Sequence, residues 1–228
     1  MQHTGKALRA GLKLLLKSLL ALVVLLALGY VAKLIGPHFG LLSKILIALW
    51  VVFAGFIFYF FRDPDPLKPH EPNLIVSPAH GTVDVIDETI ESEIMGGACQ
   101  RISIFLSPIN VHVQNAPVSA TITRVQHTPG RFKSAVKPAS TVHNENVLIG
   151  FALVDRLNEK VAIRLIAGVL ARRIIPWVAL GDVVPRSERI SLIQFGSRCD
   201  LYLPRTAKIK IKLGTKVIGG QSIVAAFE

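Results

Sequence analysis

Two long apolar runs near the N-terminus constrain the fold of this chain more than any other feature of its sequence. The first extends from Leu12 to Leu34 and the second from Leu41 to Phe61, and a segment that contains glycine and proline separates them. Each run approaches the ~20 residues that an α-helix needs to cross a bilayer. The pattern therefore predicts an N-terminal helical membrane hairpin, with helices that lie in the membrane interface as the alternative.

Basic residues flank both runs and predict how such a hairpin is oriented. They are Lys6, Arg9, Lys13 and Lys17 before or within the first run, and Arg62 and Lys68 after the second. Because positively charged flanks stay in the cytoplasm, we expect both ends of the hairpin there, with the rest of the chain on the cytoplasmic side of the cell membrane. A formal net charge of +11 beside such runs favours an anionic membrane over nucleic acid as a partner.

A proline-rich stretch separates the apolar runs from the rest of the chain. Proline cannot continue a helix, so we expect a membrane anchor over residues 1–61, a linker over 62–72 and one globular domain over 73–228. In that domain short runs of β-forming residues alternate with turn residues, which predicts a mainly β fold, a β-sandwich or barrel-sandwich. The expected strands are Leu74–Val76, Gly81–Ile86, Gln100–Leu106, Ala120–His127, Val147–Asp155, Lys160–Ala167, Ser191–Gln194, Cys199–Leu203 and Lys208–Leu213. A helical stretch is expected around Val169–Ile175.

Lysine and apolar residues alternate strictly near the C-terminus. In a strand, Ile209, Ile211 and Leu213 would share one face and the lysines would face water or an anionic lipid surface. The segment resembles the barrel-sandwich element of lipoyl and biotinyl domains, but it lacks their modifiable lysine in a tight hairpin. The two cysteines, Cys99 and Cys199, show no metal-ligand spacing, and no other cluster predicts a metal site.

Four strings in the globular domain, in this order along the chain, resemble the small bacterial and archaeal phosphatidylserine decarboxylases. They are Ser77-Pro78-Ala79-His80-Gly81, residues 105–118 with Ser107-Pro108-Ile109-Asn110-Val111-His112 at their start, residues 166–174, and Phe195-Gly196-Ser197-Arg198. A Gly-Ser pair between two strands is by itself an ordinary turn. Four strings in order are far more specific than any one of them.

The resemblance implies that the protein makes its own cofactor. In that family the chain breaks between the residues that match Gly196 and Ser197. The serine hydroxyl attacks the glycine carbonyl, the resulting ester undergoes β-elimination, and the dehydroalanine that remains is hydrolysed to a pyruvoyl group. Its ketone would form a Schiff base with phosphatidylserine and accept electrons as carbon dioxide leaves, which gives phosphatidylethanolamine. The large and small chains of one precursor would form a heterodimer, and a higher homo-oligomer is compatible with the sequence.

The matching strings also supply candidate site residues. His112 matches the histidine of the family's Ser-Pro-x-x-x-His string and is the first candidate for proton transfer, since the ordinary histidine pKa of about 6.5 suits that role. A structural strand histidine is the alternative. Arg172 and Arg198 are candidates for binding a substrate carboxylate or phosphate, and surface salt bridges are their alternative role.

His80 departs from the family, which usually has Asp in the matching Ser-Pro-Ala-Asp-Gly string. The resemblance implies that this Asp supports the base in self-cleavage. A neutral histidine could act as the base directly, but it cannot replace an anionic orienting group, and Asp84 and Asp87 lie further along the expected strand. Relatives usually have two glycines in the stretch that leads to the cleavage site, whereas residues 185–191 contain none.

The sequence therefore supports one leading hypothesis and two rivals. The leading one is a membrane-anchored, pyruvoyl-dependent phosphatidylserine decarboxylase with Ser197, His112 and His80 as catalytic residues. The first rival is an unprocessed, membrane-bound pseudoenzyme that binds lipid or scaffolds partners, and His80 is the sign for it. The second is a membrane-anchored adaptor with a lipoyl-like domain, which the absence of coiled-coil heptads disfavours.

Overall fold

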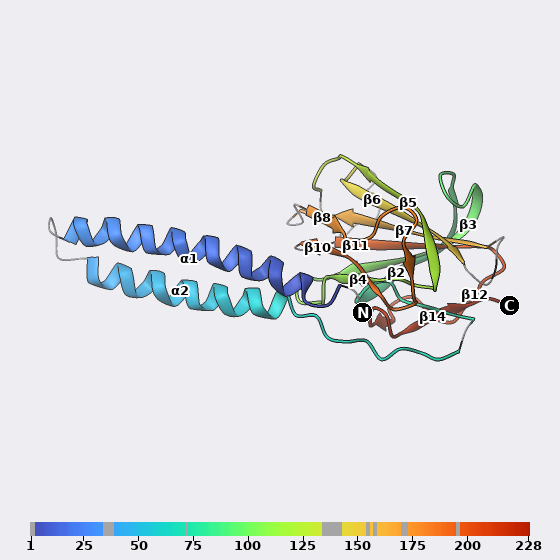
Figure 1. The fold of residues 1–228 in the computed structure, drawn as a ribbon, viewed down its shortest axis with the longest axis horizontal. Coiled ribbons are helices and arrows are strands. Elements are labelled where there is room, and N and C mark those ends of the chain that lie inside the picture. Colours follow the sequence, from blue (N-terminus) through green and yellow to red (C-terminus); the bar gives the residue numbers. More distant parts are fainter. Residues whose placement is uncertain are drawn as a thin grey trace. The chain divides into compact units, whose positions relative to one another are not determined.

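The computed structural model describes residues 3–33, 39–71, 73–133, 143–153, 156, 159–169, 173–194 and 197–228. The chain divides into two compact units (Figure 1). One is Gly5–Asp63, and the other contains Pro64–Glu228 together with the described residues that precede Gly5.

Two apolar helices, α1 (Lys6–Lys33) and α2 (Phe39–Phe60), make up the first unit. They lie side by side as a hairpin (Figure 1), and the Trp50 indole nitrogen donates a hydrogen bond to the Ser18 hydroxyl at 3.2 Å. Large apolar side chains such as Leu20 and Val52 are mostly exposed, and by length and composition both helices can cross a membrane. Because such apolar surface is unfavourable in water, the hairpin is consistent with membrane association.

The second unit is mainly β, as predicted, and its described residues form three antiparallel sheets. The largest has eight strands and curls into a half-barrel (Figure 1). In spatial order these strands are β13 (Lys216–Val217), β2 (Gly81–Glu91), β3 (Gly97–Leu106), β11 (Ser197–Leu203), β7 (Lys160–Ala167), β6 (Asn146–Leu153), β5 (Ala120–Thr128) and β9 (Val183–Val184). The second sheet has the order β4 (Val113–Asn115), β10 (Arg189–Gln194), β8 (Arg173–Pro176). The third has the order β1 (Leu74–Val76), β14 (Ile223–Ala226), β12 (Lys208–Ile209).

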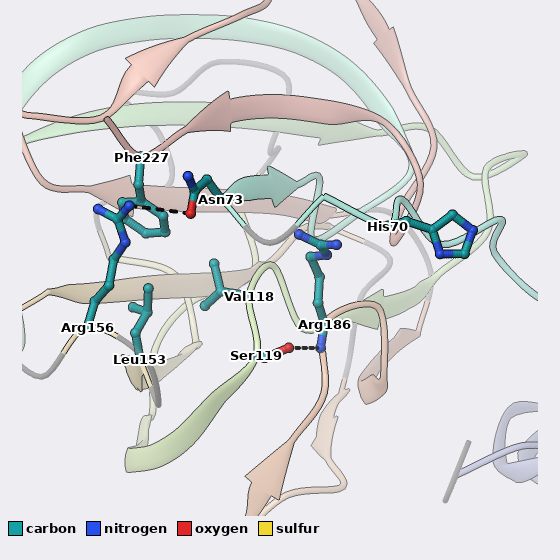
Figure 2. A pocket seen from close by; sticks show the side chains of 8 residues that line it. All are labelled: His70, Asn73, Val118, Ser119, Leu153, Arg156, Arg186 and Phe227. Carbon is teal, nitrogen blue, oxygen red and sulfur yellow. Dashed lines mark hydrogen bonds between the residues drawn. The ribbon is translucent and has the colours of Figure 1, made fainter.

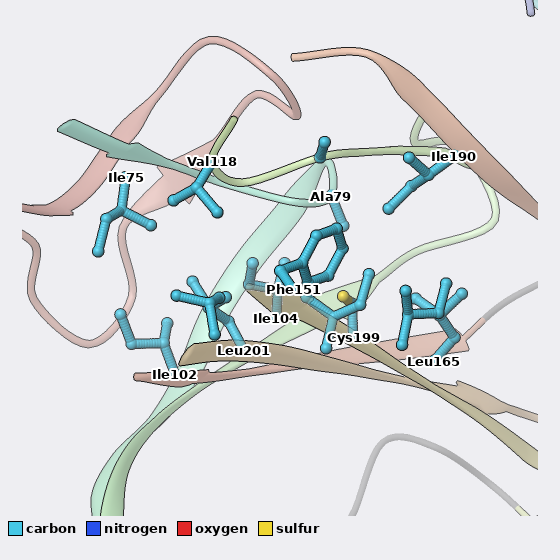
Figure 3. Close-up of a cluster of buried hydrophobic side chains, with 14 of the residues drawn as sticks. Ile75, Ala79, Ile102, Ile104, Val118, Phe151, Leu165, Ile190, Cys199 and Leu201 are labelled. Atoms are coloured by element: carbon cyan, nitrogen blue, oxygen red, sulfur yellow. The ribbon is translucent and has the colours of Figure 1, made fainter. Parts of the chain in front are cut away.

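One hydrophobic cluster holds the three sheets together. Figure 3 shows Phe151 of β6 in its middle, with Ile104 and Leu201 from the large sheet and with Ile75 and Ile190 from the two small sheets. All five side chains are fully buried. Burying side chains of this size contributes about 1.5–3 kcal/mol each, so this cluster fixes how the small sheets lie against the large one.

The predicted helical stretch around Val169–Ile175 is wrong over its described C-terminal part. Residues from Arg173 onward form strand β8, in which Ile174 and Ile175 pair with Ile193 and Leu192 of β10. Two adjacent β-branched residues lose less side-chain freedom in a pleated strand than in a helix, and β10 supplies the pairing partner.

The C-terminal lysine-rich strand is shorter than predicted. It was expected over Lys208–Leu213, but β12 ends at Ile209, and Leu213 is 62 % exposed rather than packed in the core. The chain turns at Gly214, whose φ is +80° and whose N–H bonds to the Val83 carbonyl. Leu213 therefore belongs to the turn that carries the chain across to β13.

Candidate active site

Ser197 is the first residue of an interior strand of the large sheet. It pairs with Leu106 on β3 and with Ala167 on β7, so β11 has a hydrogen-bonded neighbour on each side. Because the strands are antiparallel, several strand ends lie level with it. We call this region the Ser197 end of the sheet, and it comprises Gly81, Leu106, Thr128, Asn146, Ala167 and Ser197. Gly196 and Phe195 lie outside the described residues.

His112 lies in the loop that follows Leu106, and its side chain is fully buried. Its Nδ1 is 2.8 Å from the Asn110 carbonyl oxygen. A carbonyl oxygen can only accept, so Nδ1 carries a proton and donates it to Asn110. The His112 carbonyl accepts a hydrogen bond from the Ile193 N–H at 3.1 Å. His112 is thereby tied to β10, the strand that runs into the Gly196-Ser197 segment.

His80 is half-buried and lines a cavity of about 340 Å³. Val111, Asp65 and Gly219 also line this cavity, which therefore reaches the residue next to His112. Gly219 lies directly against the His80 ring, since a Cβ added there would be 3.0 Å from the ring carbon Cδ2. His80 immediately precedes Gly81, the β2 residue that is level with Leu106 on β3 and Ser197 on β11. Two strand spacings separate β2 from β11, so the backbone at Gly81 lies roughly 10 Å from the backbone at Ser197.

Arg198 points away from the hydrophobic core, and its side chain is 1 % exposed. Both terminal guanidinium nitrogens donate to the Asp84 carboxylate, at 2.6 Å from Nη1 and 2.5 Å from Nη2. Asp84 reaches Arg198 from a bulge in β2. Asp87 is held in the same way by Arg101. The carboxylates of Asp84 and Asp87 are therefore engaged with arginines, Asp84 with Arg198 of β11 and Asp87 with Arg101 of β3. Arg172 lies outside the described residues.

Burial dominates the electrostatics further along β11. It raises the pKa of the Asp200 carboxyl, although a hydrogen bond from Ser103 and the charges of Arg101 and Arg198 act in the opposite direction. Burial also raises the pKa of the Cys199 thiol well above its ordinary value. Cys199 is therefore an uncharged core residue.

Two arginines that sequence reasoning missed hold the proline-rich linker against this site. Arg189 is fully buried and donates to the exposed Asp65 carboxylate at 2.8 Å, which holds the pKa of Asp65 below its usual range. Arg186 donates to the backbone carbonyls of Pro69, Glu71 and Leu74. Both arginines lie in or just before β10. The linker therefore forms one wall of the His80 cavity and is fastened to the strand that leads to Gly196-Ser197.

A second cavity, of about 260 Å³, lies near the start of β5 and the end of β6 (Figure 2). This is the opposite end of the sheet from Ser197. Figure 2 shows Arg156 beside Phe227 and Asn73, and Arg186 beside Ser119. Arg156 donates to the Glu228 carbonyl at 2.9 Å. None of the candidate residues that the structure describes lines this cavity, so the His80 cavity is the better candidate.

The comparisons with known proteins decide the family. The model of the phosphatidylserine decarboxylase family matches residues 53–225. Curated relatives named phosphatidylserine decarboxylase proenzyme include one from Desulfotalea psychrophila, 37% identical over 181 residues (79% of this chain, 84% of the relative). Another is from Syntrophus aciditrophicus, 40% identical over 172 residues (75% and 80%). A third is from Cytophaga hutchinsonii, 35% identical over 191 residues (84% and 86%). This chain belongs to the phosphatidylserine decarboxylase family. The family resemblance drawn from four short strings is thus confirmed.

Ser187 gives this member of the phosphatidylserine decarboxylase family a left-handed backbone turn within residues 185–191, which contain no glycine. Ser187 has a φ of +69°, and it is the one non-glycine residue with positive φ among the residues that the structure describes. Its hydroxyl donates to the Gly220 carbonyl at 2.6 Å, and its own carbonyl accepts from the Asn115 side chain at 3.0 Å. The glycine-type backbone turn is thus present, with side-chain hydrogen bonds holding it.

Proposed function

We propose that this chain decarboxylates phosphatidylserine to phosphatidylethanolamine with a pyruvoyl group made from its own Ser197. The observation that carries the proposal is the position of residue 197 at the start of an interior strand. The loop that carries His112 begins at Leu106, which pairs with residue 197. At its other end the His112 carbonyl bonds to Ile193 of β10, the strand that leads to residue 197. The names of relatives that are 35–40% identical over most of the chain support the same activity.

Self-cleavage would use only groups of this chain and water. The Ser197 Oγ attacks the Gly196 carbonyl carbon, the amide C–N bond breaks, and the freed nitrogen takes up a proton. Loss of the Ser197 Cα proton then expels the Gly196 carboxylate, and water replaces the nitrogen, which leaves as ammonia. His112 is our candidate for accepting and returning these protons at Nε2, because its Nδ1 proton is fixed on the Asn110 carbonyl.

The cofactor proposed at position 197 is a small covalent carbonyl group. A pyruvoyl group supplies a ketone that draws electrons from an amine-bearing substrate as carbon dioxide leaves. The burial of His112 keeps water from the proton that this residue would deliver to the substrate carbon. The His80 cavity is large enough for a lipid headgroup. The two products of cleavage would stay together as a heterodimer, since β11 is hydrogen-bonded to β3 and β7 along its length.

We propose different roles for the two candidate arginines. Arg172 remains our candidate for binding the substrate's carboxylate or phosphate. Arg198 would have to leave Asp84 to do the same, so its bidentate pair supports a positioning role, in which it fixes the residue next to position 197. His80 would act as a neutral hydrogen-bonding partner in the cavity it lines.

The N-terminal unit is the proposed membrane anchor. Both helices are apolar enough to span a bilayer, and the basic residues at their outer ends support a hairpin with both termini in the cytoplasm. The catalytic unit would then lie on the cytoplasmic side, where it meets the headgroups of the inner leaflet.

The test is the intact mass of the purified full-length chain. We expect a large chain that ends at Gly196 and a small chain that begins with a pyruvoyl group at position 197. Ser197→Ala should give one uncleaved chain, and Ser92→Ala, which changes an exposed serine, should cleave like the unmodified protein. A single full-length chain from all three proteins, together with no release of carbon dioxide from phosphatidylserine, would leave the unprocessed pseudoenzyme as the better account.

A further inference from the structure

Three exposed apolar side chains gather at the Ser197 end of the sheet. They are Ile109, Val169 and Phe132, which are 63 %, 57 % and 41 % exposed. Single exposed apolar residues are normal on any protein surface. These three lie on three separate loops that meet at the candidate active site, and such a grouping marks an interaction surface.

The sheet register brings the three loops together. Ile109 follows Leu106 by three residues and Val169 follows Ala167 by two, and both Leu106 and Ala167 pair with Ser197. The loop of Phe132 is fixed beside them by Asn144. The Asn144 side chain donates to the Ala167 carbonyl at 2.7 Å and to the Lys133 carbonyl at 2.8 Å. All three apolar residues therefore lie on loops that adjoin the strand ends beside Ser197.

The charges on the same loops are mainly positive. Arg131 and Lys133 flank Phe132 and are exposed, and the exposed Arg173 pairs in register with Gln194, two residues before Gly196. In the described parts of these loops Glu145 is the acidic residue, and it lies 3.2 Å from the His127 ring nitrogen. Apolar side chains bordered by basic ones are suited to a bilayer surface that contains anionic lipid.

We propose that the Ser197 end of the sheet docks on the surface of an anionic phospholipid bilayer, with Ile109, Phe132 and Val169 inserted among the headgroups. This inference rests on the proposed function and deepens it, because it states how a lipid would reach the site without leaving the membrane. The headgroup enters between the loops while the acyl chains remain in the bilayer. The basic side chains then contact lipid phosphates around the entry point.

Depth-dependent fluorescence quenching tests the docking directly. Single cysteines replace Ile109 or Val169, and Ile90→Cys, which lies at the other end of β2 and is 77 % exposed, is the matched control. Cys99 and Cys199 are buried, and burial raises the pKa of both thiols, so a thiol-reactive fluorophore should label only the introduced cysteines. The full chain is placed in vesicles of phosphatidylcholine and phosphatidylglycerol that carry a nitroxide on the acyl chain.

The proposal predicts a several-fold larger loss of fluorescence at positions 109 and 169 than at position 90. Replacing phosphatidylglycerol with neutral lipid should reduce that loss, because the basic residues then have no counter-charge. Equal quenching at all three positions would overturn the proposal and leave the surface to an acidic protein partner. Quenching does not depend on turnover. If positions 109 and 169 are quenched but no carbon dioxide is released from phosphatidylserine, the proposed function is wrong and the docking stands. If carbon dioxide is released but the three positions are quenched equally, the docking is wrong and the proposed function stands.

Discussion

Buried polar residues hold the segment before Gly196-Ser197 in place. Ser187 and Arg189 are both fully buried, and each bonds to a part of the chain that is distant in sequence, Ser187 to Gly220 and Arg189 to Asp65. Buried polar groups are costly unless they are hydrogen-bonded. These two residues therefore stabilise one particular path of the backbone toward Gly196, and hydrophobic burial alone would not select that path.

Substitutions of Ser187 should separate backbone strain from hydrogen bonding. Ser187→Ala loses the hydrogen bond to the Gly220 carbonyl and keeps the positive φ, so we expect the free energy of unfolding to fall by about 1–2 kcal/mol. Ser187→Gly loses the same bond but relieves about 1–2 kcal/mol of left-handed strain. Thermal unfolding should therefore show a smaller loss for glycine than for alanine. Equal losses would contradict this account of the turn.

His112 should control proton transfer. Replacing it with asparagine removes the Nε2 base while an amide can still bond to the Asn110 carbonyl, so we expect self-cleavage to slow by about 100-fold or more. The measurement is the fraction of cleaved chain against time by mass spectrometry. His127→Asn is the control, because His127 is half exposed and bonds to Glu145, which lies in the loop just before β6. Cleavage at the normal rate in His112→Asn would assign the base to another residue.

At the scale of elements, pairing between strands determines the secondary structure wherever the spacing of apolar residues does not. The strands Leu74–Val76 and Lys160–Ala167 follow from local pattern and have the predicted bounds, and α2 lies within two residues of its predicted run, whereas α1 begins six residues before Leu12. Strand β8 does not follow from local pattern, because its apolar residues are compatible with a helix or a strand and only the pairing with β10 selects the strand. The two-residue strands β9 and β13 exist only through their partners β5 and β2.

The candidate site was predictable only where a short motif carried it. His112, His80 and position 197 were found from the four strings, and the structure places them around one end of the large sheet. The Arg189–Asp65 pair could not be found, since 124 residues separate the partners in sequence. Ser187 could not be found either, because serine has no intrinsic preference for the left-handed region.

The stability that the β2–β3 turn contributes should depend on pH through Glu91. The buried Glu91 carboxylate accepts hydrogen bonds from the N–H groups of Glu93, Ile94 and Met95. Burial alone would raise its pKa, but these three bonds and Arg164 hold the pKa of Glu91 below its ordinary value. A lowered pKa in the folded state contributes stability above the unfolded pKa, and that contribution disappears as the pH falls through the folded pKa.

Glu91→Gln should therefore be less stable than the unmodified protein at pH 7, by about 1–2 kcal/mol. The difference should shrink only as the pH falls below the ordinary glutamate pKa of about 4.3 and through the lowered pKa of the folded state. Chemical unfolding at several pH values measures both quantities. Glu88→Gln, which changes an exposed carboxylate of the same strand, is the control. A difference that stays constant at every pH at which the protein remains folded would contradict the role of the carboxylate charge.

At the scale of the whole molecule, the linker is part of the catalytic unit. Arg186 donates to two of its carbonyls, those of Pro69 and Glu71, and Arg189 binds Asp65. A flexible tether would not form a wall of the His80 cavity. The linker therefore has a second role besides connection, since any movement of residues 64–71 changes the shape of the candidate site.

Arg186→Ala should loosen the linker without unfolding the domain. Three backbone carbonyls would lose their donor, so we expect limited proteolysis within residues 64–71 to become several-fold faster. Arg205→Ala is a matched control, because Arg205 is exposed and bonds only weakly to Glu88 at 3.2 Å. An unchanged rate of proteolysis in Arg186→Ala would contradict this role of Arg186, because the other linker contacts would then hold residues 64–71 in place without it.

The interior place of β11 has a consequence for the mature protein after the proposed break. Cutting a sheet ordinarily risks exposing unpaired strand edges, which recruit other chains and lead to aggregation. Here the new chain end falls just before a strand whose two neighbours, β3 and β7, remain bonded to it. Maturation would therefore create two new termini without creating a new edge, and the cut protein would be no more prone to self-association than its precursor.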